Sequence, residues 1–213
     1  MAKKLEGAGL RGQVAGQTSL STVGKEGHGL TYRGYAIEDL ADKAKFEEVA
    51  YLLLYGHLPN RTELEAYQKK LISNRKLPEE LKKTLELIPA SAHPMDVMRT
   101  GCSVMGNLEP EGDFSNQNDA ADRILAILSS IICYWYRFSH DGVSVDTETS
   151  HETIGGQFLS LLTGKEPSED HIRCLDTSLI LYAEHGFNAS TFAARTCAST
   201  PVSYTHLTLP TSY

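Results

Sequence analysis

The chain lacks the sequence signatures that identify common metal, nucleotide and nucleophile sites. No pair of histidines has a metal-ligand spacing such as HExxH, and the four cysteines form no CxxC pair. The glycine-rich segment 24–29 lacks the strand–loop–helix context of a phosphate loop, and there is no GxSxG nucleophile elbow. These absences argue against a metal, a bound nucleotide and serine-hydrolase chemistry.

The chain also lacks an excess of positive charge and a long hydrophobic run. A net charge of −7 without a Lys/Arg stripe argues against a nucleic-acid partner. The longest apolar stretch, Ile124 to Phe138, is interrupted by Ser129 and Ser130 and is too short to cross a bilayer. The N-terminal lysines precede no apolar segment, so no secretory signal is expected. We therefore predict a cytoplasmic protein with no membrane role.

Cysteine usage fits the same compartment. The four cysteines are widely spaced, and three of them have apolar, helix-like surroundings. Buried, reduced thiols are therefore a better interpretation than disulfides or metal ligands. The four are Cys102, Cys133, Cys174 and Cys197.

What the chain does contain is a strong helical pattern behind a short β segment. Residues 1–35 are rich in glycine, serine and threonine, and 20–23 and 30–33 flank the glycine-rich turn, which predicts a small hairpin. From residue 36 onward, apolar spacing, caps and glycine or proline stops predict helices. The fold class is therefore all-α with a small N-terminal β-hairpin. The predicted helices are 37–44, 46–55, 60–73, 79–88, 118–138, 151–162, 168–185 and 188–199, with another that starts at Pro94.

The helix that starts at Pro94 is expected to pack tightly in the core. Methionine and cysteine side chains recur in it at helical spacing, which is more typical of core than of a binding surface. Small residues in the same helix would let a neighbouring helix approach closely. The spaced side chains are Met95, Met98, Cys102 and Met105, and the small residues are Gly101, Ser103 and Gly106.

Segment 178–191 is the most informative one for chemistry. Glu184 and His185 are predicted at the end of an apolar helix, Gly186 breaks it, and Asn188 begins a new helix. This junction would bring an imidazole close to backbone N–H groups at a helix N-terminus, so a small dianion could bind there. Alternatively, His185 only complements the helix dipole, which the residues taken alone favour.

Five segments resemble the citrate synthase family. LTYRGYAIEDL (30–40) and FEEVAYLLLYGHLP (46–59) are similar to its N-terminal signature. HPMDVMRTG (93–101), YWYRFSH (134–140) and 178–191 narrow the resemblance to the 2-methylcitrate synthase branch. The similarity runs almost continuously from about residue 9 to 200.

The resemblance implies a homodimeric helical enzyme whose large and small domains close over the substrates. It would condense oxaloacetate with propionyl-CoA, or with acetyl-CoA, and release CoA, as in propionate catabolism by the methylcitrate cycle. Acyl-CoA is then a substrate, and no cofactor or metal is implied. His185 matches an oxaloacetate-binding histidine of the family, which favours the anion site. Asn188 lies beside it, and Arg61 falls where a substrate-contacting arginine is expected, although an arginine at a helix start is usually only solvated.

The chain departs from the family after residue 200. The family continues into a Gly-Pro-x-His-Gly-Gly motif with the first catalytic histidine, followed by a second histidine and an aspartate, and none of these is present. We therefore expect no catalytic residue here, an incomplete large domain over 36–200 and no small domain. The 213-residue chain is expected to be inactive and prone to aggregate.

Segment 201–213 breaks the local pattern. Pro201 interrupts a helical register, and residues 202–211 can be encoded by a nucleotide sequence that resembles a transposon-end library adapter. We interpret 201–213 as a non-native tail. Two other interpretations stay open: a citrate synthase of the tricarboxylic acid cycle, and a short, non-catalytic helical protein, either a dimer partner of a full-length relative or a generic binding module.

Overall fold

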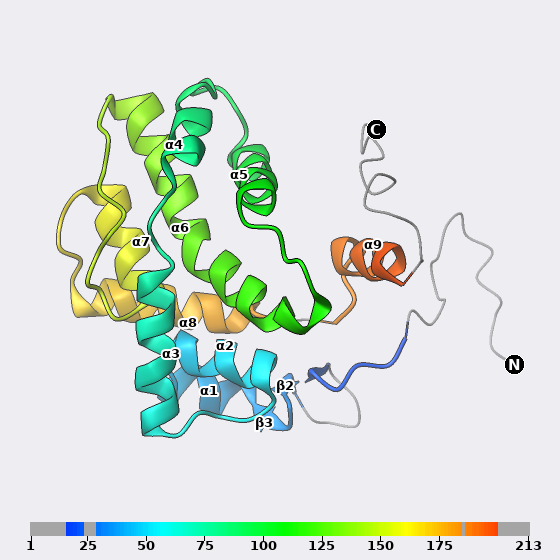
Figure 1. Cartoon of the computed structure of the whole chain (residues 1–213). Helices are drawn as coiled ribbons and strands as arrows, with labels where there is room; N and C mark the ends of the chain where they lie inside the picture. Colours follow the sequence, from blue (N-terminus) through cyan, green and yellow to red (C-terminus); the bar gives the residue numbers. More distant parts are fainter. Residues whose placement is uncertain (1–15, 24–28, 185, 200–213) are drawn as a thin grey trace, which may run out of the picture. The chain divides into compact units, whose positions relative to one another are not determined.

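A computed structural model describes residues 16–23, 29–184 and 186–199 (Figure 1). The chain divides into two units. The terminal unit combines the chain up to Gly34 with the chain from Glu184 onward, and the helical unit runs from Tyr35 to Ala183. The predicted tail, 201–213, lies outside the described residues.

The terminal unit contains a short antiparallel ladder and one helix. β1 (Ser21–Thr22) pairs with β2 (Thr31–Tyr32), with Ser21 opposite Tyr32. The Arg33 N–H extends the ladder by donating to the Leu20 carbonyl at 2.8 Å. The predicted hairpin is therefore confirmed in its strands, while its turn, 24–28, lies outside the described residues. The helix of this unit is α9 (Ala189–Ala198).

The helical unit confirms the predicted all-α fold class. Its only β-strand among the described residues is β3 (Tyr35–Ala36), which leads directly into the first helix. Over the described parts of the chain, no helix has the length and apolar character needed to cross a membrane. The helices are α1 (Ile37–Lys43), α2 (Phe46–Tyr55), α3 (Arg61–Ser73), α4 (Glu79–Glu86), α5 (Pro94–Leu108), α6 (Gln117–Asp141), α7 (Ile154–Thr163) and α8 (Glu169–Tyr182), with a 3-10 turn at Phe114–Asn116.

The long helix α6 is the centre of the helical unit (Figure 1). It packs against α3, α4, α5 and α7, so its apolar face is covered from several sides. Burial of that face is the main driving force for the assembly of the unit. The core cluster consists of Leu77, Leu81, Leu85, Val97, Met105, Ile127, Ile131, Tyr134 and Trp135.

Local signals in the sequence set several helix ends. Asn60 and Glu63 form a capping box, with the Glu63 N–H donating to Asn60 Oδ1 at 3.0 Å. Gly56 and Gly164 end α2 and α7 in the left-handed conformation that glycine adopts without steric cost. These ends lie where the sequence predicts them because a cap depends only on neighbouring residues.

Several predicted helix ends are wrong. α4 ends at Glu86 instead of at residue 88, and α6 ends at Asp141 instead of at residue 138. α6 begins at Gln117 with Asn116 as its N-cap, not at Asn118, because the 3-10 turn already leads into the helix. α7 begins at Ile154 instead of at residue 151, because the Thr153 hydroxyl accepts the Gly156 N–H at 2.9 Å and takes the cap position. α8 ends at Tyr182, before the predicted end at residue 185.

The predicted methionine core is only partly correct. Met105 is 3% exposed, but Met95 is 62% exposed. The buried face of α5 instead runs through Val97, Gly101 and Met105, which are spaced four residues apart. Gly101 provides the close approach that the sequence predicts, since a Cβ there would lie 2.6 Å from Ile131 Cγ2.

Two further predictions about small side chains need correction. A Cβ at Gly106 would have no neighbour within 4 Å, so this glycine provides no close helix contact, and Ser103 is exposed. The four cysteines carry thiols and form no disulfide, but only Cys133 is fully buried, and Cys174 is exposed. Cys174 faces solvent because the buried face of α8 runs through Asp176 and Ile180.

Candidate functional site

The chain between α8 and α9 is the segment in which the sequence predicts an anion site. Gly186 has a left-handed backbone, with φ of +88°, which lets the chain turn sharply before α9. Glycine adopts this conformation without a Cβ clash, so the turn is encoded locally. His185 lies outside the described residues, and its binding role stays a prediction.

Asn188 is the N-cap of α9. Its side-chain Oδ1 accepts the Thr191 N–H at 2.8 Å, and its own N–H donates to the Gly186 carbonyl at 3.1 Å. The first capping interaction was expected from the sequence, and it fixes where α9 begins. Asn188 is thus held in place next to a helix N-terminus, where backbone N–H groups favour negative charge.

Glu184 lies at the centre of a set of contacts within the terminal unit. Its Oε1 accepts the Gly186 N–H and, at 3.3 Å, the Ser21 hydroxyl. Its backbone N–H donates to the Tyr32 phenol oxygen at 3.2 Å. The sequence places Glu184 only at a helix end, whereas the structure shows that it connects the hairpin to the turn before α9.

A cavity of about 610 Å³ lies beside these contacts. Its lining residues are mostly glycine, serine and threonine. Ser21 and Gly186 belong both to the cavity wall and to the contacts of Glu184. The lining residues are Gly16, Gln17, Thr18, Ser21, Thr22, Val23 and Gly186.

Arg61 lies in the helical unit, whereas Asn188 belongs to the terminal unit. Arg61 is the first residue of α3, and its side chain is 93% exposed. Its Nε donates to Glu65 Oε1 at 3.0 Å in a helical surface pair. Such exposed pairs contribute little to stability, so Glu65 does not prevent the arginine from binding another anion.

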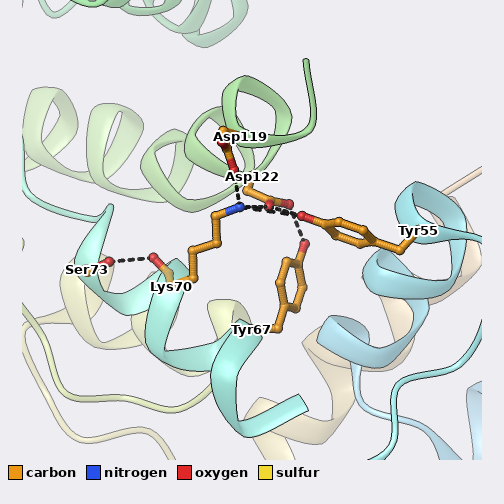
Figure 2. Close-up of polar contacts among 6 residues, drawn as sticks. All are labelled: Tyr55, Tyr67, Lys70, Ser73, Asp119 and Asp122. Carbon is orange, nitrogen blue, oxygen red and sulfur yellow. Dashed lines mark hydrogen bonds and ion pairs between the residues drawn. The ribbon is translucent and has the colours of Figure 1, made fainter. Parts of the chain in front are cut away.

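A buried polar cluster joins α2, α3 and α6 (Figure 2). At its centre, the carboxylate of Asp122 is fully buried and accepts hydrogen bonds from the phenols of Tyr55 and Tyr67, the latter at 3.0 Å. The Lys70 ammonium lies 2.5 Å from Asp122 Oδ2 and 2.6 Å from Asp119 Oδ1. Three donors from two other helices therefore satisfy one buried carboxylate.

The electrostatics of this cluster favour a structural role. Burial and then the Asp122 carboxylate raise the pKa of Tyr55 to about 12, and the same causes raise the pKa of Tyr67. Burial alone would lower the pKa of Lys70, but its hydrogen bonds to Asp119 and Asp122 outweigh burial and raise it. Lys70 therefore keeps its charge and both phenols keep their protons at neutral pH, so none of these three side chains is available as a general base.

A second cavity, of about 440 Å³, borders this cluster. Its cations, Lys70 and Arg123, are both engaged with carboxylates, with Arg123 Nη1 lying 2.6 Å from Glu109 Oε2. Paired charges of this kind give a free anion little to bind. We therefore assign no ligand to this cavity.

Another group of buried charges surrounds the N-terminus of α7. Glu47 Oε1 accepts the Ile154 N–H at 2.7 Å, and Asp176 accepts the N–H of Phe46, the first residue of α2. Burial raises the pKa of Glu47 to about 7 and also raises the pKa of Asp176. Each carboxylate thus caps a helix other than its own, which ties α8 to α2 and α2 to α7.

The sequence did not reveal either buried cluster. In the sequence, Asp122 has only the position of a favourable charge near the N-terminus of a helix, but in the structure it shares the buried face of α6 with Ala126 and Cys133. Residues four and eleven positions apart lie on the same face of an α-helix. The spacing of Asp122 from these two side chains is therefore the signal that could have revealed its burial. Nothing in the sequence identifies Lys70 as its partner. Within the described residues, no three histidine, cysteine or acidic side chains converge as metal ligands.

Comparison with known proteins covers nearly the whole chain. The family model described as "Citrate synthase, C-terminal domain" matches residues 9–206. A 2-methylcitrate synthase of Shewanella oneidensis is 67% identical over 199 residues, which are 93% of this chain and 53% of that protein. A citrate synthase of Acidithiobacillus ferridurans is 37% identical over 90% of this chain and 52% of its own length.

Solved structures that resemble this chain are also citrate synthases. The crystal structure of citrate synthase from Pyrobaculum aerophilum matches with a TM-score of 0.80 and 32% identity, over 88% of this chain and 49% of that one. The chain therefore spans about half the length of the relatives that it matches.

Proposed function

The chain belongs to the citrate synthase family, and from this membership we propose that the whole protein condenses oxaloacetate with propionyl-CoA to 2-methylcitrate and CoA. The observation that carries the proposal is the 67% identity to the Shewanella oneidensis enzyme over 93% of this chain. The proposed place of the reaction is propionate catabolism by the methylcitrate cycle, in the cytoplasm. The acyl-CoA is a substrate, and the proposed chemistry uses no cofactor or metal.

The proposed oxaloacetate site uses His185, Asn188 and Arg61. A protonated or donating imidazole next to the N-terminus of α9 would give charge-assisted hydrogen bonds to a dianion. The capping geometry of Asn188 supports this, since it places an amide side chain at that helix end. Support for Arg61 comes from the resemblance and from its exposed guanidinium.

The proton transfers of the reaction are proposed to use two histidines and an aspartate that are not among the 213 residues. In this proposal, residues 36–200 are part of a large helical domain, a small domain closes over the substrates, and the complete protein is a homodimer. Closure would exclude water from the reacting groups. Residues 201–213 are proposed to be a non-native tail, which adapter-free sequencing of the source DNA across the codon of Thr200 would test. Native DNA that encodes Pro201 to Tyr213 would contradict it.

The test of function uses the complete gene product. We expect CoA release from propionyl-CoA in the presence of oxaloacetate, with a higher kcat/KM than for acetyl-CoA. Preference for acetyl-CoA would instead support a citrate synthase of the tricarboxylic acid cycle, an alternative favoured by the 37% identity to the Acidithiobacillus ferridurans enzyme. Release with neither thioester would overturn the proposal and support a non-catalytic helical partner protein.

A matched pair of variants tests the proposed site. His185→Ala should raise the KM for oxaloacetate and leave the KM for propionyl-CoA nearly unchanged. Arg61→Ala should act in the same direction, and Glu65→Ala is its control because it removes only the surface partner of Arg61. An unchanged oxaloacetate KM in His185→Ala would remove this histidine from the proposed site.

A further inference from the structure

Two buried carboxyl groups from different helices meet the first turn of α7. Glu47, in α2, is fully buried, and its Oε1 accepts the Ile154 N–H at 2.7 Å. Asp176, in α8, is 4% exposed, and its Oδ1 lies so close to Gly155 that a Cβ at this glycine would be 2.5 Å from it. The absence of a side chain at Gly155 therefore lets a second carboxyl group approach the same helix end.

The start of α7 suits one negative charge better than two. One carboxylate is favoured there because the N–H groups of the first turn carry partial positive charge. Burial raises the pKa of Glu47 to about 7, the Ile154 N–H opposes this rise, and the charge of Asp176 adds to it. Two like charges in a buried position repel each other strongly because water and salt screen them little.

Arg75 is a cation that faces Glu47, from the segment between α3 and α4. It is fully buried, and its charge lowers the pKa of Glu47 only after the stronger effects of burial. The contacts of its guanidinium run to the carbonyl oxygens of Thr149 and His151, not to Glu47. Tyr67, which faces Glu47 from α3, stays neutral because burial raises the pKa of its phenol. Arg75 therefore makes a charge on Glu47 less costly without neutralising it.

The cations near Asp176 are also engaged with other groups. Burial raises the pKa of Asp176 and outweighs the charges of Arg173 and Lys45, which lower it. Arg173 donates to the Ala44 carbonyl at 2.9 Å, and Lys45 Nζ lies 3.5 Å from Glu152 Oε2. These cations favour the charged form of Asp176, so this carboxylate is the one that holds the single charge.

Two further titratable groups near this junction have partners of their own. His151, in the segment before α7, lies 3.4 Å from Glu166 Oε2, and Glu48 Oε2 accepts the Lys45 N–H at 2.8 Å. The ten residues of α7 include no titratable side chain. Any dependence of the first turn of α7 on pH must therefore come from the groups that surround it.

We propose that Glu47 makes the start of α7 a proton-sensitive switch. With its proton, Glu47 is neutral and holds Ile154 through Oε1, while Asp176 carries the single charge beside Gly155. Its Oε2 has no hydrogen-bond partner among the described residues, so a proton there removes the charge and leaves the bond to Ile154 in place. Without that proton, two charged carboxylates face one helix end, and the first turn of α7 opens locally.

Hydrogen exchange of the complete gene product at about pH 6 and about pH 8 tests this switch. Protection factors allow for the intrinsic effect of pH on exchange and report how often an amide opens. We expect the protection of amides 154–157 to fall by about 10-fold between these pH values, as for a carboxyl group whose pKa is about 7 when closed and 4.5 when open.

Low, non-denaturing urea separates local opening from global unfolding. Local opening exposes little surface and should hardly respond to urea, whereas exchange through global unfolding accelerates with it. Amides of α6 around Ile131 serve as the reference for global unfolding, because they lie in the core of the helical unit. If amides 154–157 respond to urea as strongly as these amides do, the start of α7 has no switch of its own and the proposal is wrong.

Two substitutions assign the switch to its residues. Glu47→Gln keeps an oxygen for the Ile154 N–H and cannot ionise, so the protection of amides 154–157 should no longer depend on pH. Asp176→Asn keeps an oxygen for the Phe46 N–H and removes the facing charge. The pKa of Glu47 should then fall, and the change between about pH 6 and about pH 8 should become smaller. Glu38→Gln, at an exposed position of α1, is the control and should behave as the unmodified protein does.

The outcomes that overturn the proposal are distinct. Protection that is equal at both pH values in the unmodified protein would exclude the switch. An unchanged pH response in Glu47→Gln would assign the titration to another group, such as His151. If Glu47→Gln fails to fold, which thermal unfolding shows, the unmodified protein and Asp176→Asn still decide. None of these measurements follows turnover, so the result is independent of the proposed function.

Discussion

The Lys70 ammonium lies 2.5 Å from Oδ2 of the fully buried Asp122 carboxylate, and this ion pair joins α3 to α6 (Figure 2). The same ammonium lies 2.6 Å from Asp119, whose side chain is largely exposed. One lysine thus has one buried and one exposed partner. Both pairs join the same ammonium to an aspartate carboxylate and differ in the exposure of that aspartate. Substituting each aspartate in turn therefore measures how burial of the carboxylate changes the contribution of the pair to stability.

Asp122→Ala should destabilise the complete protein by about 3–5 kcal/mol, because it removes the buried partner of an ion pair, leaves two phenols without their acceptor and leaves Lys70 with only the exposed Asp119 carboxylate. Denaturant unfolding measures this loss as a lower midpoint. Asp119→Ala is the matched control and should change the midpoint little, because its carboxylate is exposed. Equal effects of the two substitutions would show that burial does not determine the strength of this pair.

Gly101→Ala should destabilise the helical unit by about 1–3 kcal/mol, because a Cβ would lie 2.6 Å from Ile131 Cγ2 in the core. Gly106→Ala, in the same helix, has no neighbour within 4 Å and should stabilise α5 by about 0.5–1 kcal/mol through helix propensity. Thermal unfolding should therefore shift in opposite directions for the two variants. A neutral Gly101→Ala would mean that Ile131 can move aside freely.

Glu47 should make stability depend on pH. Its pKa is about 7 in the folded protein against an ordinary 4.5, so the folded state binds its proton more tightly than the unfolded chain does. The stability that comes from the protonated form is fully present below about pH 4.5 and is lost as the pH rises through about 7. We expect a loss of about 1–3 kcal/mol from this group between about pH 5 and about pH 8.

Glu47→Gln tests this pH dependence because it removes the titration and keeps an oxygen that can accept the Ile154 N–H. The free energy of unfolding of the variant should exceed that of the unmodified protein at about pH 8, with a smaller difference at about pH 5. Glu38→Gln, at an exposed position of α1, serves as the control. A pH profile that Glu47→Gln leaves unchanged would contradict the prediction.

Asn188 offers a way to separate capping from substrate binding. Asn188→Ser and Asn188→Asp both keep an N-cap side chain, so stability should change by less than about 1 kcal/mol. If Asn188 contacts oxaloacetate as proposed, Asn188→Asp should raise the oxaloacetate KM most, because a carboxylate there would repel the dianion. Steady-state kinetics at several oxaloacetate concentrations measure the KM of each variant. Unchanged oxaloacetate KM values in both variants would limit Asn188 to its capping role.

Local features were predictable from the sequence because they depend on neighbouring residues. The capping box of Asn60 and Glu63 and the N-cap Asn188 are specified by side chains within three residues of the groups that they bind. The all-α class followed from apolar periodicity. The methionine stripe of α5 was misjudged, because Met95 lies off the buried face even though its spacing is helical. Periodicity alone does not show which face of a helix the partner helices cover.

The family, the helical class, most helix ends and the turn at Gly186 all follow from the sequence alone, since each is encoded by a continuous segment. The pairing of Lys70 with Asp122 and the hydrogen bond from the Ser21 hydroxyl to Glu184 emerge only when the chain is folded. These partners are 52 and 163 residues apart in the chain. Contacts over such separations depend on how whole elements pack, and packing follows from the burial of many side chains at once, not from any one motif.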